Sequence, residues 1–152
     1  LTESWNGSTW TEVADLNSPR SSFSGGGEFT NAMAVGTQTA GTTVEKWNGT
    51  SWTEIAALNL GRSNAEFTGN ATLGLVMGGG TPLPTPLTAT TEYWNGTAWS
   101  EQNDMATARN NFARGGTTTA AIIGGGYPNP GVAGSSEVWA SPTIAIRTVT
   151  VS

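Results

Sequence analysis

The sequence ESWNGSTWTE, residues 3–12, recurs twice in closely related form, as EKWNGTSWTE at 45–54 and EYWNGTAWSE at 92–101. Each copy consists of two short β-prone runs joined by Asn-Gly. This dipeptide is typical of a two-residue β-hairpin turn in which both central residues have positive φ. The repeated stretch therefore predicts three tryptophan-bearing hairpins.

The turn fixes which residues of each hairpin lie opposite one another. In the second copy, a two-residue turn places Trp47 opposite Thr50 and Glu45 opposite Trp52. The two tryptophans then become diagonal neighbours on one face. We expect that face to pack against the next repeat along the chain.

The rest of the chain is spaced relative to these hairpins. The first tryptophan of each hairpin and a fourth tryptophan fall at positions 5, 47, 94 and 139, so the intervals are 42, 47 and 45 residues. Only the stretch between a recurring glycine and the next glutamate changes in length. Such periods are typical of β-propeller blades, which are small four-stranded sheets. The pattern predicts a rigid repeat with one variable loop.

Composition agrees with an all-β propeller. The 152 residues include seven tryptophans and 21 glycines, and no segment has apolar residues at helical spacing. We expect about three and a half blades of four-stranded antiparallel sheets within one region, 1–152: a half blade at 1–16, blades at 20–57 and 62–104, and a C-terminal blade at 109–152, with 143–152 as its outer strand. Closed propellers need about four blades. The chain is therefore expected to belong to a larger or oligomeric propeller.

Charge and missing residue types exclude several functions. The net charge of −5 and the single lysine leave no basic patch for nucleic acid or an anionic membrane. No apolar run is long enough for membrane insertion. Cysteine and histidine are absent, which removes thiolate metal sites, thiol nucleophiles and the commonest general base. We expect no cofactor, no metal and no enzymatic activity.

The combined pattern, as in LVMGGG at 75–80 followed by TEYWNGTAWSEQNDMATAR at 91–109, resembles the kelch repeat. Kelch repeats have a glycine doublet ending the second strand, an aromatic residue on the third and a tryptophan on the fourth, and they build β-propellers. This chain differs in having Trp where Tyr is common and in a shorter turn. Its Asn-Gly turns and Thr/Gly-rich strands are also similar to kelch-like repeats of bacteriophage virion and microbial surface proteins.

The recurring charged and amide residues have two interpretations. Three arginines occupy equivalent positions in the repeat: Arg20, Arg62 and Arg109. They could form a ring that binds an anionic ligand. Alternatively, each could bind carbonyl groups or a carboxylate between blades, with Glu12, Glu54 and Glu101 as candidate partners. Recurrence in every repeat favours the structural role, and it also argues against catalysis by the recurring glutamates Glu3, Glu45, Glu92 and Glu137. Asparagines in N-x-S/T sequences are interpreted as turn residues chosen for positive φ rather than as glycan acceptors.

The variable loop is the strongest candidate for ligand binding, because loop variation on a fixed scaffold diversifies binding surfaces. Tyr127 and Asn129 lie in one such loop, and Ser22, Asn64 and Asn111 follow the recurring arginines.

Three functions remain open at this point. The favoured one is a non-catalytic phage virion or tail-associated protein that displays loops for host attachment. Its partners would be other virion proteins or copies of itself and a cell-surface glycan or receptor. The alternatives are an extracellular microbial lectin or adhesin and a propeller fragment of a larger enzyme. The expected location is the virion or the extracellular surface.

Overall fold

The computed structural model describes residues 1–38, 41–81, 87–128, 131–132 and 134–141. The predicted outer strand at 143–152 and the candidate residue Asn129 lie outside these ranges. The described residues form thirteen strands and no helix, so the all-β prediction is confirmed. The strands are β1 (Thr2–Trp5), β2 (Trp10–Val13), β3 (Ser24–Glu28), β4 (Asn31–Val35), β5 (Val44–Trp47), β6 (Trp52–Glu54), β7 (Glu66–Gly69), β8 (Gly74–Met77), β9 (Thr91–Trp94), β10 (Trp99–Gln102), β11 (Ala113–Gly116), β12 (Ala120–Gly124) and β13 (Ser136–Ala140).

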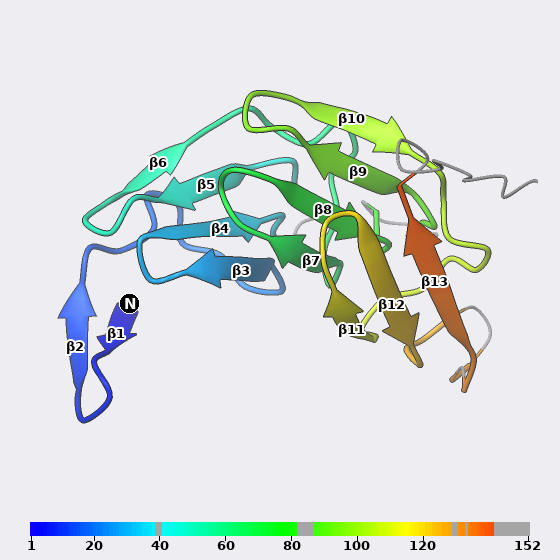
Figure 1. Ribbon diagram of the computed structural model, residues 1–152, viewed down its shortest axis with the longest axis horizontal. Helices are drawn as coiled ribbons and strands as arrows, with labels where there is room; N and C mark the ends of the chain where they lie inside the picture. Colours follow the sequence, from blue (N-terminus) through cyan, green and yellow to red (C-terminus); the bar gives the residue numbers. More distant parts are fainter. Residues whose placement is uncertain (39–40, 82–86, 129–130, 133, 142–152) are drawn as a thin grey trace, which may run out of the picture.

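The strands form four antiparallel sheets. Within each sheet, strands that are consecutive in the sequence are hydrogen-bonded neighbours. We call the sheets the N-terminal hairpin (β1–β2), the first sheet (β3–β6), the second sheet (β7–β10) and the third sheet (β11–β13). Strands β3, β7 and β11 contact one another on the inner side, while β6 and β10 lie outside (Figure 1). The arrangement is propeller-like. Among the described residues there is no helix that could span a membrane.

The tryptophans of each hairpin pair directly across the two strands. Trp47 lies opposite Trp52, and Glu45 lies opposite Glu54. The two indole rings are tilted with their centroids 5.4 Å apart. The predicted pairing of Trp47 with Thr50 is wrong because the loop between the strands contains four residues rather than two.

The asparagine of each hairpin acts through its side chain. The Oδ1 atom of Asn48 accepts hydrogen bonds from the backbone N–H groups of Thr50 and Ser51, both at 2.9 Å. Only Gly49 takes a positive φ in this turn, at 95°. The expectation of positive φ at the asparagine is therefore wrong. Asn is suited to this position because its short amide can imitate a backbone carbonyl.

The tryptophan face of a sheet packs against the sheet that precedes it in the chain, not the one that follows as expected. One buried cluster joins two tryptophans of the second sheet to apolar residues of the first: Met33, Val35, Val44, Phe67, Val76, Trp94 and Trp99 are among its members. A second cluster joins the second and third sheets in the same way through Leu75, Met77, Phe112, Ala121, Ile123 and Trp139. The core is thus a series of similar layers between sheets.

Glycine at the end of each inner strand permits a turn that a side chain would block. Gly69 has a φ of 115°, and a Cβ atom there would overlap the Leu73 carbonyl oxygen. We expect Gly69→Ala to lower the free energy of unfolding by about 2 to 4 kcal/mol, the sum of a left-handed backbone and a steric clash. Urea denaturation followed by tryptophan fluorescence measures the loss.

The matched control is Gly7→Ala. Gly7 has a similar φ of 96°, but nothing lies within 4 Å of its Cβ position. This variant carries only the backbone cost, about 1 to 2 kcal/mol. Equal losses in the two variants would show that the close packing at Gly69 is wrong.

Candidate functional site

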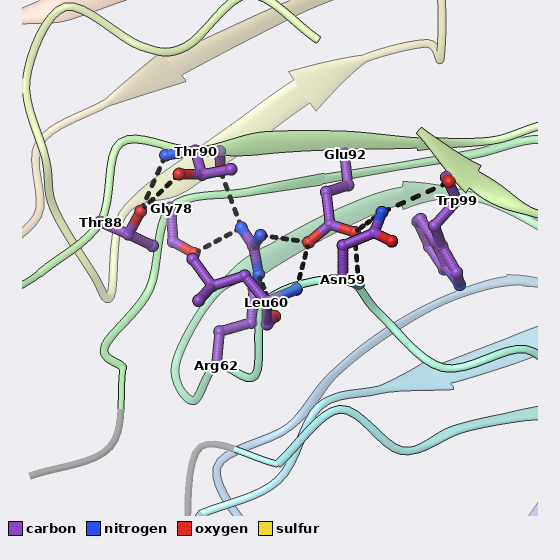
Figure 2. A network of polar contacts seen from close by, with 8 residues as sticks. All are labelled: Asn59, Leu60, Arg62, Gly78, Thr88, Thr90, Glu92 and Trp99. Carbon is purple, nitrogen blue, oxygen red and sulfur yellow. Dashed lines mark hydrogen bonds and ion pairs between the residues drawn. The ribbon is translucent and has the colours of Figure 1, made fainter. Parts of the chain in front are cut away.

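A buried arginine and glutamate hold the connection that enters the second sheet (Figure 2). The Nη2 atom of Arg62 lies 2.6 Å from Oε1 of Glu92, and both side chains are almost fully buried. Nη1 of the same arginine donates to the carbonyl oxygens of Gly78 at 3.1 Å and Thr90 at 2.7 Å. Burial lowers the pKa of Arg62, while the Glu92 carboxylate opposes that shift. The guanidinium therefore uses its Nη1 and Nη2 donors in bonds to the second sheet.

The carboxylate of Glu92 also accepts hydrogen bonds from the chain that precedes Arg62. Its Oε2 atom accepts from the backbone N–H of Asn59 at 2.8 Å and from the Asn59 side-chain amide at 2.9 Å. Its Oε1 atom also accepts from the N–H of Leu60 at 3.2 Å. Asn59 and Leu60 lie in the connection between β6 and β7. A single buried carboxylate thus ties this connection to the third strand of the next sheet.

The same arrangement recurs in the first and third sheets. Arg20 pairs with Glu45, and Arg109 pairs with Glu137 at 2.6 Å. The predicted partners are wrong: Glu12, Glu54 and Glu101 are all exposed. Each ion pair joins the connection that precedes a sheet to the third strand of that sheet. The three arginines therefore do not form an exposed ring for an anionic ligand.

The candidate residues after the arginines do come together. Ser22, Asn64 and Asn111 all take positive φ, at 55°, 50° and 50°. The Asn64 N–H donates to the Ser22 carbonyl at 2.8 Å, and the Asn111 N–H donates to the Asn64 carbonyl at 3.2 Å. We call these three residues the polar arc. The arc crosses three sheets at the start of their inner strands.

Tyr127 lies beside the polar arc. Its backbone forms an antiparallel bridge with Asn110, with N–H to carbonyl distances of 2.9 and 3.3 Å. The Tyr127 side chain is 54% exposed. The structure therefore brings four of the five predicted binding residues to one end of the molecule, and the fifth, Asn129, is not among the described residues. An exposed ring next to hydroxyl and amide groups is suited to a polar, neutral ligand.

The opposite end of the inner strands contains a hollow that sequence reasoning missed. This open cavity of about 740 Å³ is lined by the strand ends and by turns rich in Gly and Thr. Arg114 lines this cavity, and its Nε atom lies 3.3 Å from Oε2 of Glu66. Partial burial raises the pKa of Glu66, and Arg114 counteracts this. The recurring glycine seven residues after each arginine was the one sequence signal for this position.

The described residues contain no group of three or more acidic side chains placed to bind a metal ion. The site therefore consists of hydroxyl, amide and aromatic groups on a scaffold whose recurring arginines are paired internally.

Comparisons with known proteins reveal a similarity in fold but none that indicates a function. No protein-family model matches the chain, and no curated protein sequence matches it. The chain matches 107 solved chains in fold. One is the structure of YjhT, with a TM-score of 0.64 and 18% sequence identity, over 75% of this chain and 36% of that one. The chain thus spans about a third of that neighbour, and the likeness concerns the fold alone.

Proposed function

We propose that the chain is part of a kelch-type β-propeller that acts as a non-catalytic binding module on the surface of a phage virion or tail. The described sheets would make up about three and a half of its blades. The single observation that carries the proposal is the pairing of Arg20, Arg62 and Arg109 with a glutamate on the third strand of the sheet that follows each arginine. The frame uses its charged groups for stability, which leaves the loops for recognition.

The loops next to the polar arc support this interpretation. The connections between the second and third strands differ in length. In the first sheet the connection runs from Val35, where β4 ends, to Val44, where β5 begins. In the second sheet it is longer and runs from Met77, at the end of β8, to Thr91, at the start of β9. The bond of each arginine to the glutamate of the third strand closes the base of this connection. A loop with a fixed base can change length without altering the sheet. Several such loops on one particle can act together where a single contact is weak.

The location is tested by mass spectrometry of purified phage particles from a host that carries this coding sequence. The proposal predicts peptides of this chain in particles that sediment with full virions. Their absence from such particles, while the protein is present in the lysate, would contradict the virion role.

A second candidate is an extracellular lectin or adhesin, and exposed Tyr127 is the observation that favours it. Aromatic rings stack on the apolar faces of sugars while amides bind their hydroxyl groups. If the chain binds a glycan on an array, we expect Tyr127→Ala to weaken binding by about tenfold or more, the loss of one stacking contact. Isothermal titration with that glycan measures the change.

Phe29→Ala is the control for this experiment, since Phe29 is 67% exposed and lies at the other end of strand β3. It should bind as the unmodified protein does. Equal weakening in both variants would mean that the loss is not specific to Tyr127 and would contradict a stacking contact there. Turnover of the glycan by the isolated chain would instead favour the enzyme alternative.

A further inference from the structure

The interfaces between the first and second sheets and between the second and third sheets use one pattern of complementary faces. A face of the first sheet with Met33, Val35 and Val44 receives Trp94 and Trp99 of the second sheet. The equivalent face of the second sheet, with Leu75, Met77 and partly buried Tyr93, receives Trp139 of the third sheet. Each contact therefore joins the apolar face of one sheet to the tryptophan face of the sheet that follows.

The third sheet has the same apolar face without a covering tryptophan among the described residues. Ile122 lies opposite Val138 in the third sheet, just as Leu75 lies opposite Tyr93 at the equivalent position of the second sheet. Ile122 is 51% exposed and Val138 is 76% exposed, whereas Leu75 is fully buried. Around Ile122 the surface is hollowed by about 300 Å³ between Ala113 and Ser136. We call this surface the Ile122 face.

The N-terminal hairpin offers the complementary surface. Trp5 and Trp10 pair across the hairpin with centroids 5.4 Å apart and an interplanar angle of 42°. Trp94 and Trp99, which are buried in an interface, have almost the same geometry at 5.3 Å and 42°. Yet Trp5 and Trp10 are 47% and 64% exposed. We call this surface the Trp5 face.

We propose that the Trp5 face of one molecule docks on the Ile122 face of a second copy of this chain, head to tail. The occupant is a second copy because the two faces belong to one chain and repeat an interface that the chain already makes twice. They lie at opposite ends of the row of sheets (Figure 1), so they cannot meet within one described molecule. A contact between different faces extends into a ring or a filament according to its rotation.

Sedimentation velocity of the full chain over about a hundredfold range of concentration tests the proposal. The unmodified chain should associate beyond a monomer. Val138→Asp and Trp10→Asp should each weaken association by about tenfold or more, since each would bury a carboxylate in an apolar contact. An equimolar mixture of the two variants should form a dimer and nothing larger, because each variant retains one intact face.

Val132→Asp is the matched control, since Val132 is 77% exposed and lies outside both faces. It should associate like the unmodified chain. Thermal unfolding of each variant checks that the sheets remain folded. A monomeric unmodified chain, undiminished association in Val138→Asp, or a mixture that stays monomeric would overturn the proposal. The Ile122 face would then be left to a different protein or to a segment outside these 152 residues.

Discussion

Arg62→Met is expected to lower the free energy of unfolding by about 3 to 5 kcal/mol. Arg62 is fully buried, and its removal leaves the Glu92 carboxylate without its cationic partner in the interior. The carbonyl oxygens of Gly78 and Thr90 lose their donors at the same time. Methionine fills much of the same volume, so the loss reflects charge and hydrogen bonding more than a cavity. Urea denaturation at pH 7 measures it.

Arg114→Met is the control for this comparison. Arg114 also pairs with a glutamate, Glu66, but both side chains are more than a quarter exposed. Water solvates the remaining carboxylate there, so we expect a loss of about 1 kcal/mol or less. If Arg62→Met were no more destabilising than Arg114→Met, the buried pair would not hold the second sheet together.

Phe67→Ala is expected to destabilise the fold by about 3 to 5 kcal/mol through the cavity that it leaves. Phe67 is fully buried between the first and second sheets. Its ring meets Trp99 edge to face, with centroids 6.5 Å apart. Because Trp99 lies in this interface, its fluorescence should also shift to longer wavelength in the variant. Thermal and urea denaturation measure the change in stability.

Phe29→Ala removes the same side chain from an exposed turn. Phe29 is 67% exposed, so its loss should change stability by about 0.5 kcal/mol or less. Similar losses in Phe67→Ala and Phe29→Ala would contradict the packing between the first two sheets.

The architecture was predictable because the repeat is present in the sequence itself. Three copies of one hairpin and constant distances to the following arginine and glycine were sufficient to predict short antiparallel strands. The pairing within the hairpin was not predictable from the Asn-Gly dipeptide. The side chain of Asn48 binds two backbone N–H groups, and this lengthens the loop to four residues and changes the register.

The partners of the arginines were missed for a different physical reason. Arg20, Arg62 and Arg109 lie 25, 30 and 28 residues before their glutamates. The spacing varies because the loop of changing length lies between the two residues. The glutamates just after the tryptophans do lie at a constant distance from the arginines, but those glutamates are exposed. Contacts across a variable loop leave no fixed spacing in one sequence.

The candidate site was predicted only in part. Ser22, Asn64 and Asn111 were chosen for their place after the arginines, and backbone hydrogen bonds do link them. Their positive φ values are not predictable from the sequence, since Ser and Asn also occur at many ordinary turn positions. The open cavity near Arg114 depends on how three inner strands meet, which local sequence does not specify.

The three recurring arginines and their partner glutamates stabilise the sheets and do not form a binding site. A double-mutant cycle on Arg62 and Glu92 tests this role most directly. Urea denaturation would compare the unmodified chain with Arg62→Met, Glu92→Met and the double variant. Because either single change leaves a buried partner unpaired, we predict a coupling energy of about 2 to 3 kcal/mol. Losses that add to within about 0.5 kcal/mol would mean that the two side chains act independently and would contradict the account.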